Sequence, residues 1–400
     1  MSEKATKIPQ IRFDGYTDAW EQRSLGNVAK ITMGQSPNSE NYTENPSDYI
    51  LVQGNADMKD GRVVPRVWTT QVTKTADKGD LILSVRAPVG DIGKTDYDVV
   101  LGRGVAAIKG NEFLFQSLGR MKQNGYWTKL STGSTFESIN SNDIKEAQIL
   151  LPSLEEQDKI GTFFKQLDDL IALHQRECDL LAKMKKSYLQ KMFPKNGEDK
   201  PEIRFAGFTD AWEQRELGEI SERVTRKNKD LESTLPLTIS AQDGLIDQNE
   251  FFNKTVASRD VSGYYLMKNG EFAYNKSYSN GYPWGAVKRL DRYEMGVLST
   301  LYIIFKPTKV NSTFLAKYYD TDNWYKEVSK HAAEGARNHG LLNIAASDFF
   351  KTELLIPSSI EEQAKIGDFF TDLDDLITLH QRELDSLKKM KKSLLQMMFV

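Results

Sequence analysis

The side chains in this sequence that suit chemistry are hydrogen-bonding, basic and aromatic residues set among glycines. They fall in two stretches, residues 27–151 and 219–356. The first stretch contains Gln53, Asn55, Lys74, Ser84, Arg86, Lys94 and Arg103, and the second contains Arg259, Tyr274, Asn275, Lys276, Tyr278, Asn280, Tyr282, Lys288, Arg289, Arg337, Asn338 and His339. Arginine pairs with guanine, asparagine and glutamine pair with adenine, and basic residues contact phosphates. These residue types also occur in many loop-rich domains, so on their own they are a weak indication of DNA binding.

Motifs for catalysis are absent from the sequence. It has no GxxxxGK[ST] phosphate loop, no HExxH, no CxxC and no GxSxG. It also lacks the glycine-rich turn and the Asn/Asp-Pro-Pro-aromatic tetrapeptide of a DNA adenine methyltransferase. The hydroxyl-rich run from Ser131 to Ser134 has no histidine near it in sequence. The sequence therefore predicts a chain that is not an enzyme on its own.

The elements that must position these residues are framed by two repeats. Residues 11–26, IRFDGYTDAWEQRSLG, return at 203–218 with 13 of 16 positions identical, and residues 155–193 return at 361–399 with 29 of 39 identical. The segments between the repeats show no comparable resemblance to each other. This pattern indicates one scaffold that presents two different recognition surfaces.

The longer repeat predicts a long helix in each copy. Each copy begins with a proline and a serine that is followed three residues later by glutamate, the spacing of a capping box, at Pro152, Ser153 and Glu156 and at Pro357, Ser359 and Glu362. Apolar residues then recur at intervals of three, four or seven. They predict a buried seam formed by Ile160, Phe163, Leu167, Leu170, His174 and Leu181 and, in the second copy, by Ile366, Phe369, Leu373, Leu376, His380 and Leu387.

A helix of 39 residues is about 58 Å long, which is too long for one small domain to cover. The matching seam in this chain is the other copy, so we expect the two helices to pack as an antiparallel coiled coil. The lysines Lys183, Lys185, Lys186, Lys388, Lys389, Lys391 and Lys392 are expected to stay solvated near the helix ends and to complement the helix dipole.

His174 and His380 occupy the same position of the two copies, which raises the question of a metal site. Neither copy has a second histidine or a cysteine at ligand spacing, so we expect no metal and interpret the pair as polar seam residues that fix the register. Cys178 is replaced by Leu384 in the second copy and is interpreted as a small apolar filler.

The two inserts have the pattern of mixed α/β domains. Strands are predicted at residues 81–85, 99–108, 235–239 and 296–305, and one helix per insert at 112–130 and 313–333. The expected fold class is therefore α/β, with a first recognition domain at 1–151, a first spacer helix at 152–195, a second recognition domain at 196–356 and a second spacer helix at 357–400.

Composition sets the outer limits of these predictions. The chain has 400 residues and 39% hydrophobic residues, which suffice for well-packed cores, and its 53 basic and 56 acidic residues argue neither for nor against nucleic acid. It contains one cysteine, a polar N-terminal sequence and no apolar run that would span a bilayer. We therefore expect a cytoplasmic protein without disulfides.

Taken together, these motifs resemble the specificity subunit of type I restriction-modification systems. The resemblance extends from about residue 11 to 399. It rests on DAWEQR with the following Leu-Gly, on LPSLEEQDKI at 151–160 and IPSSIEEQAKI at 356–366, and on helices that end in KMKKS-LQ. Within the inserts it rests on GDLILSVRAPVGDIG at 79–93 with LGRGVAAIKG at 101–110, and on GEFAYNKSYSNGYPWGAVKRL at 270–290 with GVLSTLYIIF at 296–305.

The resemblance implies a non-catalytic DNA-recognition subunit. Each recognition domain would read one half of a split, asymmetric target in double-stranded DNA, and the helix pair would set the unread spacer. Two modification subunits that carry S-adenosylmethionine would methylate adenine at N6, and two restriction subunits that use ATP and Mg would cleave unmodified DNA. No cofactor is expected on this chain.

The residues expected to contact DNA are Asn55, Lys74, Arg86, Arg103, Asn275, Lys276, Tyr278, Asn280, Arg289 and Arg337. The structural alternative is that Arg86 pairs with Asp80 or Asp91, and that Asn275 and Asn280 serve turns. Three other functions remain open: a stand-alone enzyme, a protein-binding scaffold with a coiled-coil spacer, and a bipartite reader from another DNA-defence system.

Overall fold

The structure is a computed structural model in which the chain forms two compact units. It describes residues 7–131, 137–195, 197–240, 243–254, 256–277, 282–332, 342 and 344–400. Unit 1 comprises Met1–Glu177 and His380–Val400, and unit 2 comprises Cys178–Leu379. Each unit therefore combines one insert with parts of both long helices, and each is described by itself. No helix among the described residues is long and apolar enough to cross a membrane.

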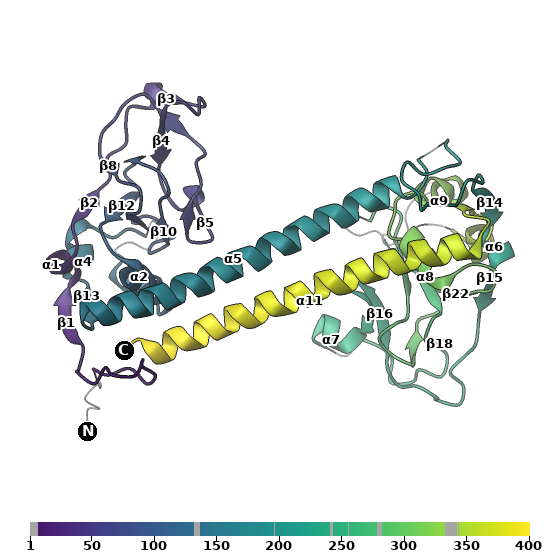
Figure 1. Ribbon diagram of the computed structural model, residues 1–400. Coiled ribbons are helices and arrows are strands. Elements are labelled where there is room, and N and C mark those ends of the chain that lie inside the picture. Colours follow the sequence, from purple (N-terminus) through teal and green to yellow (C-terminus); the bar gives the residue numbers. More distant parts are fainter. Residues whose placement is uncertain are drawn as a thin grey trace. The chain divides into compact units, whose positions relative to one another are not determined.

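The secondary structure of unit 1 is mixed (Figure 1). Its strands are β1 (Glu21–Ser24), β2 (Ile31–Met33), β3 (Tyr42–Thr43), β4 (Tyr49–Val52), β5 (Met58–Lys59), β6 (Arg62–Val63), β7 (Trp68–Thr69), β8 (Thr75–Ala76), β9 (Leu81–Ser84), β10 (Ile92–Lys94), β11 (Val99–Leu101), β12 (Val105–Ile108) and β13 (Gln148–Leu151). Its helices are α1 (Leu25–Val28), α2 (Glu112–Gln123), α3 (Tyr126–Leu130) and α4 (Ser141–Glu146), with 3-10 turns η1 (Ser39–Asn41) and η2 (Asn55–Asp57).

Unit 2 has its own strands and helices. The strands are β14 (Glu213–Glu216), β15 (Ser221–Val224), β16 (Leu237–Ser240), β17 (Gly244–Asp247), β18 (Tyr265–Lys268), β19 (Phe272–Asn275), β20 (Ala286–Arg289), β21 (Met295–Leu298), β22 (Ile303–Pro307) and β23 (Glu353–Ile356). The helices are α6 (Leu217–Ile220), α7 (Gln248–Phe252), α8 (Ser312–Tyr318), α9 (Tyr325–His331) and α10 (Ala346–Phe349). The long helices α5 (Leu154–Lys191) and α11 (Ile360–Met398) contribute to both units.

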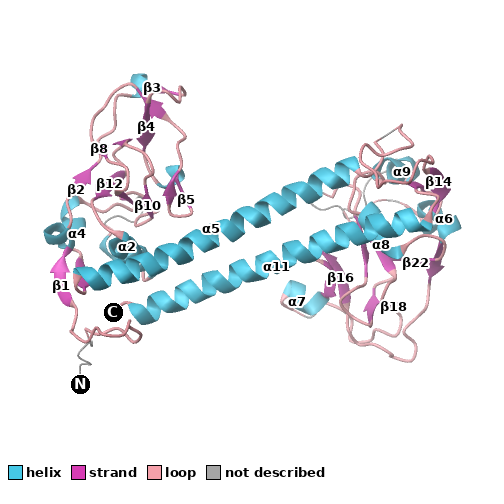
Figure 2. Ribbon diagram, viewed as in Figure 1, coloured by secondary structure: helices cyan, strands magenta, loops and turns pink. Residues whose placement is uncertain are grey.

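The sheets of each unit are mixed or antiparallel. In unit 1 the strand orders are β2-β12-β9-β10-β6-β5, β3-β7-β4-β11-β8 and β1-β13, with β10 parallel to β6 and β11 parallel to β4. In unit 2 they are β15-β22-β19-β20, β16-β17, β18-β21 and β14-β23. Figure 2 shows α2 between the strands of unit 1 and the beginning of α5. The predicted α/β class, with two sheet-rich domains and two long helices, is confirmed.

Several predicted elements are interrupted in the structure. The strand predicted at 99–108 is two strands, because Gly102–Gly104 forms a turn, and the strand predicted at 296–305 is likewise divided into β21 and β22. The single helix predicted at 112–130 is wrong because Gly125 takes a left-handed φ of 70° and separates α2 from α3. The helix predicted at 313–333 also divides, since α8 ends at Tyr318, whose carbonyl accepts the Thr321 hydroxyl at 2.6 Å.

The long helices start where the proline–serine signals predict, but only half of each capping box forms. Ser153 Oγ accepts the Glu156 amide at 3.4 Å, and Ser359 Oγ accepts the Glu362 amide at the same distance. The carboxylate of Glu156 instead accepts two hydrogen bonds from the Arg12 guanidinium, at 2.7 and 2.8 Å. The hydrogen bond and charge of Glu156 raise the pKa of Arg12 against the opposing effect of burial. The shorter repeat is thereby held to the longer one.

Within each unit the two long helices pack antiparallel. In unit 1, Asp168 pairs with Lys391 at 2.5 Å, and further along α5 His174 contacts His380. In unit 2, Lys185 pairs with Asp374 at 2.6 Å, and the ring of Tyr188 packs against Phe369 at 5.2 Å. As residue numbers rise along α5 they fall along α11, which confirms the predicted antiparallel pairing.

The buried seam differs in phase from the predicted one. Leu170 and Leu376 are wrong as seam positions, because 40% and 41% of their surface is exposed. Cys178 and Leu384 are instead buried. Cys178, predicted to be a small apolar filler, is therefore a seam residue. The other predicted positions are buried or half-buried, namely Ile160, Phe163, Leu167, His174, Leu181, Ile366, Phe369, Leu373, His380 and Leu387. The physical reason is that a coiled-coil seam alternates steps of three and four residues, as in 167, 171, 174, 178 and 181.

Two lysines that were expected to stay solvated lie in this seam. Lys185 and Lys391 retain only 24% and 22% of their side-chain surface exposed, and each pairs with an aspartate of the facing helix. The expectation is wrong for these two residues because each ammonium has a carboxylate partner on the facing helix, and charged groups that lose solvent are paired in this way.

Candidate nucleic-acid interface

The predicted contact residues of unit 1 gather around the turn between β11 and β12. The Gly102 amide donates to the Val52 carbonyl at 2.7 Å, and the Leu101 amide donates to the Lys74 carbonyl at 2.7 Å. On the other side of the turn, the Val85 amide donates to the Gly104 carbonyl at 2.9 Å. These bonds bring three segments that are far apart in sequence to one turn.

Glycine makes this convergence possible. A Cβ added to Gly104 would lie 2.1 Å from the Gln53 carbonyl oxygen, and one added to Gly34 would lie 2.1 Å from the Gly102 carbonyl oxygen. Any side chain at these positions would push the surrounding segments apart. The sequence signal for this arrangement is the LGRG tetrapeptide, in which a glycine on each side of Arg103 permits close approach of the backbone.

All four predicted residues of the first domain border this turn. Arg103 is its exposed central residue, and its amide donates to Ser36 Oγ at 3.1 Å. Arg86 follows Val85 and forms a backbone bridge with Ser138. Lys74 is exposed, and Asn55 is half-buried at the start of η2, which follows β4. We call Asn55, Lys74, Arg86 and Arg103 the turn cluster.

The cations of the turn cluster lack a carboxylate partner among the described residues, unlike Arg62 and Lys94 of the same domain. Within the part of the chain that the structure describes, Lys74, Arg86 and Arg103 form no ion pair. The alternative pairing of Arg86 with Asp80 or Asp91 does not occur: Asp80 accepts the Asp77 amide, and Asp91 pairs with Lys122. Three exposed cations and an amide side chain therefore remain available to phosphates and base edges.

Among the described residues of the second domain, Asn275 and Arg289 lie apart. Asn275 pairs with Ala286 in the β19–β20 register, whereas Arg289 pairs with Phe272 at the opposite end. Three residues of an extended strand separate the two positions by about 10 Å. Tyr278, Asn280 and Arg337 lie outside the described residues, so these three stay predictions.

The described residues of this second set have structural partners. Arg289 donates to Asp291 at 2.7 Å and to Ser312 at 3.0 Å, with 19% of its side chain exposed. The Asn275 side chain accepts the Ser277 amide at 3.0 Å, which matches the turn-forming alternative, and the Lys276 ammonium lies 3.4 Å from the Ile344 carbonyl oxygen. A contact of these residues with DNA remains a prediction.

The two domains nevertheless share one arrangement of strands and helices, although the sequences of the inserts are dissimilar. Strand β9 pairs with β12 and β10, and β19 pairs in the same way with β22 and β20. Asn111 caps α2, and its side-chain amide donates to Gln157 of α5. Asn311 caps α8, and its backbone N–H donates to Gln363 of α11. The dissimilar inserts are thus two versions of one α/β arrangement.

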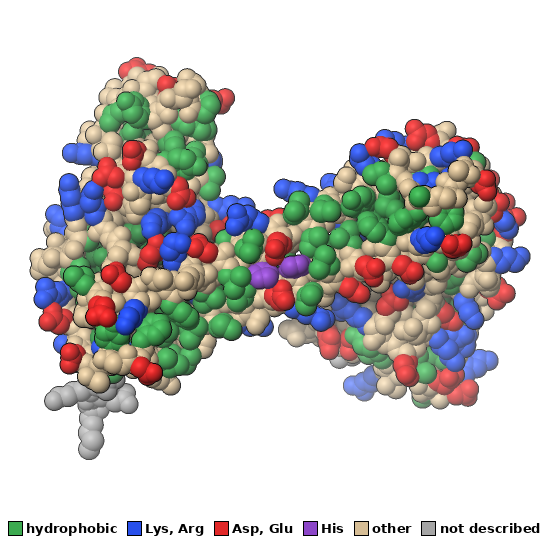
Figure 3. All heavy atoms as spheres, viewed as in Figure 1, with side chains coloured by type: hydrophobic (Ala, Val, Ile, Leu, Met, Phe, Trp, Pro, Cys, Tyr) green, Lys and Arg blue, Asp and Glu red, His purple; other side chains and the backbone are tan. Residues whose placement is uncertain are grey.

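Each unit also exposes apolar side chains on the long helices. In unit 1 they are Leu170, Leu173 and Met390, and in unit 2 they are Leu180, Met184, Leu376 and Leu379, each between 37% and 58% exposed. Leu170, Leu173 and Met390 correspond in the repeat to Leu376, Leu379 and Met184. Figure 3 shows apolar side chains at the surface of the long helices. We call these two sets, which are equivalent except that Leu180 corresponds to Ser386, the helix patches.

The fold belongs to the class of proteins that carry two copies of an α/β domain on a pair of long helices. Comparison with known proteins identifies the family. The family model described as the type I restriction modification DNA specificity domain matches residues 17–183 and 209–389. The chain therefore belongs to this family and contains two copies of the domain, which confirms the predicted resemblance.

Relatives of known designation agree with this assignment. The chain is 35% identical over 196 residues to the putative type I restriction enzyme MjaX specificity subunit of Methanocaldococcus jannaschii, which covers 47% of this chain and 44% of that protein. It is 22% identical over 407 residues to the MjaVIII specificity subunit of the same organism, over 95% of this chain and 92% of that protein. The alignment with the first of these thus spans less than half of its length.

A solved structure shares the fold. The crystal structure of the S subunit of a type I restriction-modification system from M. genitalium superposes with a TM-score of 0.65, over 98% of this chain and 99% of that one. The sequences are 16% identical, so this similarity concerns the fold alone.

Proposed function

We propose that this chain is the DNA-specificity subunit of a type I restriction-modification complex, in which each recognition domain reads one half of a bipartite, asymmetric target. The observation that carries the proposal is the combination of equivalent frames with dissimilar inserts in a chain that has two DNA specificity domains. The equivalent repeats would bind identical partner subunits, and the dissimilar inserts would read different halves of the target.

In the first domain the turn cluster supplies the reading groups. A guanidinium donates two parallel hydrogen bonds to guanine O6 and N7, which suits Arg86 and Arg103, and an asparagine amide such as Asn55 suits adenine. Lys74 suits phosphate contact, which positions the domain on the duplex without reading sequence.

The long helices suit the role of a spacer. Each is continuous for 38 or 39 residues, which corresponds to about 57 Å at 1.5 Å per residue. A buried seam with ion pairs resists bending better than a loop would. The number of base pairs left unread between the half-targets would then be set by the helix pair.

Catalysis would come from other polypeptides. Two modification subunits that carry S-adenosylmethionine would methylate adenine at N6, after flipping it from the duplex. Two restriction subunits that use ATP and Mg would cleave unmodified DNA. The helix patches provide two equivalent apolar surfaces for identical copies of such a partner. This chain would itself bind no cofactor and perform no catalysis.

The test first identifies the DNA target and then measures how strongly an Arg103 variant binds it. Methylated adenines are mapped genome-wide with and without the gene, and a split motif that vanishes on deletion supplies the duplex. Binding of this duplex to the purified chain is then measured for the wild type and for Arg103→Ala. We expect the substitution to weaken binding by about 1–3 kcal/mol, because it removes a bidentate base contact.

The matched control is Arg23→Ala, which removes the same charge from the exposed strand β1, where Arg23 pairs with Glu21 at 2.6 Å. It should leave the affinity within a few tenths of a kcal/mol. Equal affinity of Arg103→Ala and the wild type, together with an unchanged methylation motif, would remove Arg103 from the interface. Affinity that does not depend on duplex sequence or on salt would contradict DNA reading and favour a protein scaffold.

A further inference from the structure

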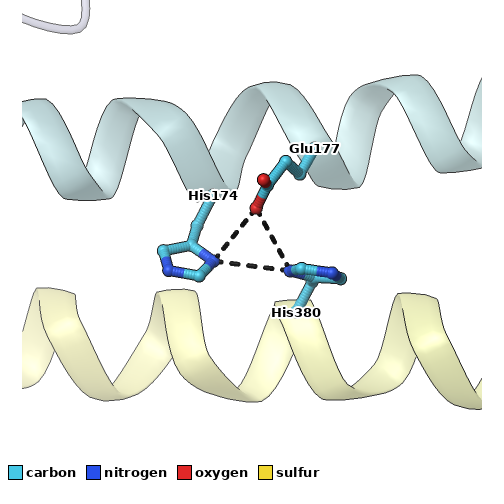
Figure 4. Close-up of side chains that lie close together, drawn as sticks. All are labelled: His174, Glu177 and His380. Atoms are coloured by element: carbon cyan, nitrogen blue, oxygen red, sulfur yellow. Dashed lines mark hydrogen bonds and ion pairs between the residues drawn. The ribbon is translucent and has the colours of Figure 1, made fainter.

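Four potential metal ligands converge on the helix pair of unit 1. They are His174 and Glu177 of α5 and His380 and Glu383 of α11. Figure 4 shows the imidazoles of His174 and His380 pointing toward each other, with the Glu177 carboxylate between them. The side chains are 18% to 46% exposed, so an ion from solvent can reach them.

The distances between the ligand atoms are short and nearly equal. The two histidine Nδ1 atoms are 3.4 Å apart, and Glu177 Oε2 lies 3.3 Å from each of them. Glu383 Oε2 lies 3.6 Å from His174 Nδ1 and 3.8 Å from His380 Nδ1. The ligand atoms of His174, Glu177 and His380 all fall within 4.8 Å of one another.

These distances approach those of a tetrahedral site. Zinc binds imidazole nitrogen and carboxylate oxygen at about 2.0–2.1 Å, so neighbouring ligand atoms in a tetrahedron lie about 3.3–3.4 Å apart. The contacts among His174, Glu177 and His380 match this edge length. The Glu383 oxygen lies 3.6 and 3.8 Å from the two Nδ1 atoms but outside the group of ligand atoms within 4.8 Å of one another, so a side-chain rotation would have to bring it to the fourth position.

Electrostatics favours a cation at the centre of this group. An ionised carboxylate only accepts hydrogen bonds, and each neutral imidazole has one nitrogen with a free lone pair. When the ring proton of each histidine is on Nε2, both Nδ1 lone pairs face the carboxylate oxygens at 3.3–3.8 Å. A divalent ion at the centre would accept electron pairs from all of these ligand atoms together.

The sequence signal for this site is present in both repeats. Each copy contains the tetrapeptide HQRE, at residues 174–177 and 380–383, which places histidine and glutamate three residues apart on one helix face. The expectation that no metal binds was drawn from each copy alone. Antiparallel pairing supplies the second histidine and the second carboxylate.

We propose that His174, Glu177, His380 and Glu383 form a binding site for a zinc-class divalent ion that links α5 to α11. Two imidazoles and two carboxylates suit zinc and the neighbouring first-row metals, and tetrahedral geometry selects zinc among them. The ion joins residues 206 positions apart in the sequence (380 minus 174) and fixes the register of the helix pair. This inference does not depend on DNA recognition.

The test uses the full-length chain after treatment with a chelator. Co²⁺ is titrated first, because tetrahedral Co²⁺ absorbs visible light far more strongly than octahedral Co²⁺, and the Zn²⁺ affinity is then measured by competition with a chromophoric chelator. We expect one ion per chain, a tetrahedral spectrum and a Zn²⁺-dependent rise in the thermal unfolding midpoint.

Three variants and a control locate the ion. His174→Gln and His380→Gln should each weaken Zn²⁺ binding at least tenfold, and Glu177→Gln should weaken it while keeping the size of the side chain. His331→Gln, in α9 of unit 2, should bind as the wild type does. Helix content measured by circular dichroism identifies any variant that does not fold. If the histidine variants do not fold, the Zn²⁺ affinity of Glu177→Gln decides the test.

Two outcomes would overturn the proposal. One is wild-type and His174→Gln chains with equal Zn²⁺ affinity, which would assign the ion to another place. The other is a weak, octahedral Co²⁺ spectrum in the wild type, which would leave the cluster as a polar contact in the seam.

Discussion

Glycines decide at the residue scale how closely segments of this molecule approach. At Gly34 and Gly104 they allow backbones to meet around the turn cluster. On the long helices, a Cβ at Gly161 would lie 2.9 Å from the Phe113 amide nitrogen, and one at Gly367 would lie 2.8 Å from the Phe314 amide nitrogen. The same glycine of the repeat thus admits the first turn of α2 in one unit and of α8 in the other.

The prediction for Gly161→Ala follows from this contact. Alanine favours a helix over glycine by about 1 kcal/mol, but the added methyl group would lie 2.9 Å from the Phe113 amide nitrogen, so the facing backbone must shift. We expect a net loss of about 1–3 kcal/mol in the free energy of unfolding, measured by urea denaturation. The control is Gly119→Ala in α2, whose added Cβ would lie 3.7 Å from Ile92 in ordinary contact. A change in the free energy of unfolding equal to that of Gly119→Ala would show that α2 can shift.

At the scale of the helices, ion pairs in the seam connect neighbouring elements of unit 2. Asp374 of α11 accepts Lys185 of α5 and Lys317 of α8, both at 2.6 Å. Burial by itself raises the pKa of Asp374, but the hydrogen bonds and charges of the two lysines outweigh it and lower the pKa below its usual 3.8. One carboxylate therefore connects both long helices to the second recognition domain.

The stability of unit 2 should depend on pH through Asp374. Its pKa is lower in the folded than in the unfolded chain, so it contributes stability above the unfolded pKa, and this contribution is lost as pH falls through the folded pKa. We expect Asp374→Asn to be less stable than the wild type at neutral pH and to lose less stability between about pH 5 and pH 2. Denaturant unfolding at several pH values measures both effects.

The neighbouring substitution Asp375→Asn, on the exposed side of α11, controls for net charge. If the free energies of unfolding of the wild type and Asp374→Asn changed with pH in parallel, the two lysines would not lower the pKa of Asp374.

At the scale of the whole molecule, each unit is completed by the end of a long helix. Phe399 packs in the core of unit 1 against Trp20, Phe113 and Phe164, with ring centroids 5.0 to 6.0 Å apart. Phe193, its equivalent in the repeat, packs in unit 2 against Trp212, Phe314 and Phe370. The last residues of the chain therefore belong to the core of the first domain.

Phe399→Ala should act on one unit selectively. The loss of a buried aromatic ring costs about 3–5 kcal/mol. We expect faster amide hydrogen exchange in β9, β12 and α2 of unit 1, while β19 and β22 of unit 2 keep their protection, because no residue of 380–400 is in the described core of unit 2. Phe193→Ala should give the reverse pattern. Equal acceleration in both units would contradict this assignment.

The repeats, the long helices and the two α/β domains of this protein could be predicted from the sequence. Identity over the repeats, the proline–serine starts at Pro152 and Pro357 and the helical spacing of apolar residues predicted two long antiparallel helices and two α/β domains. These features are local or repeated, so they can be read along the chain. The motifs of the inserts also led to the family.

Tertiary structure decided which residues meet. Arg86 and Arg103 come together because Val85 bonds to Gly104, whereas Asn275 and Arg289 lie at opposite ends of one hairpin. The second histidine of the helix pair comes from the other repeat, and the seam contains Lys185 because Asp374 faces it. Such pairings join residues far apart in sequence, and no local pattern records them. They depend on which backbones can approach closely and on where buried charges find partners.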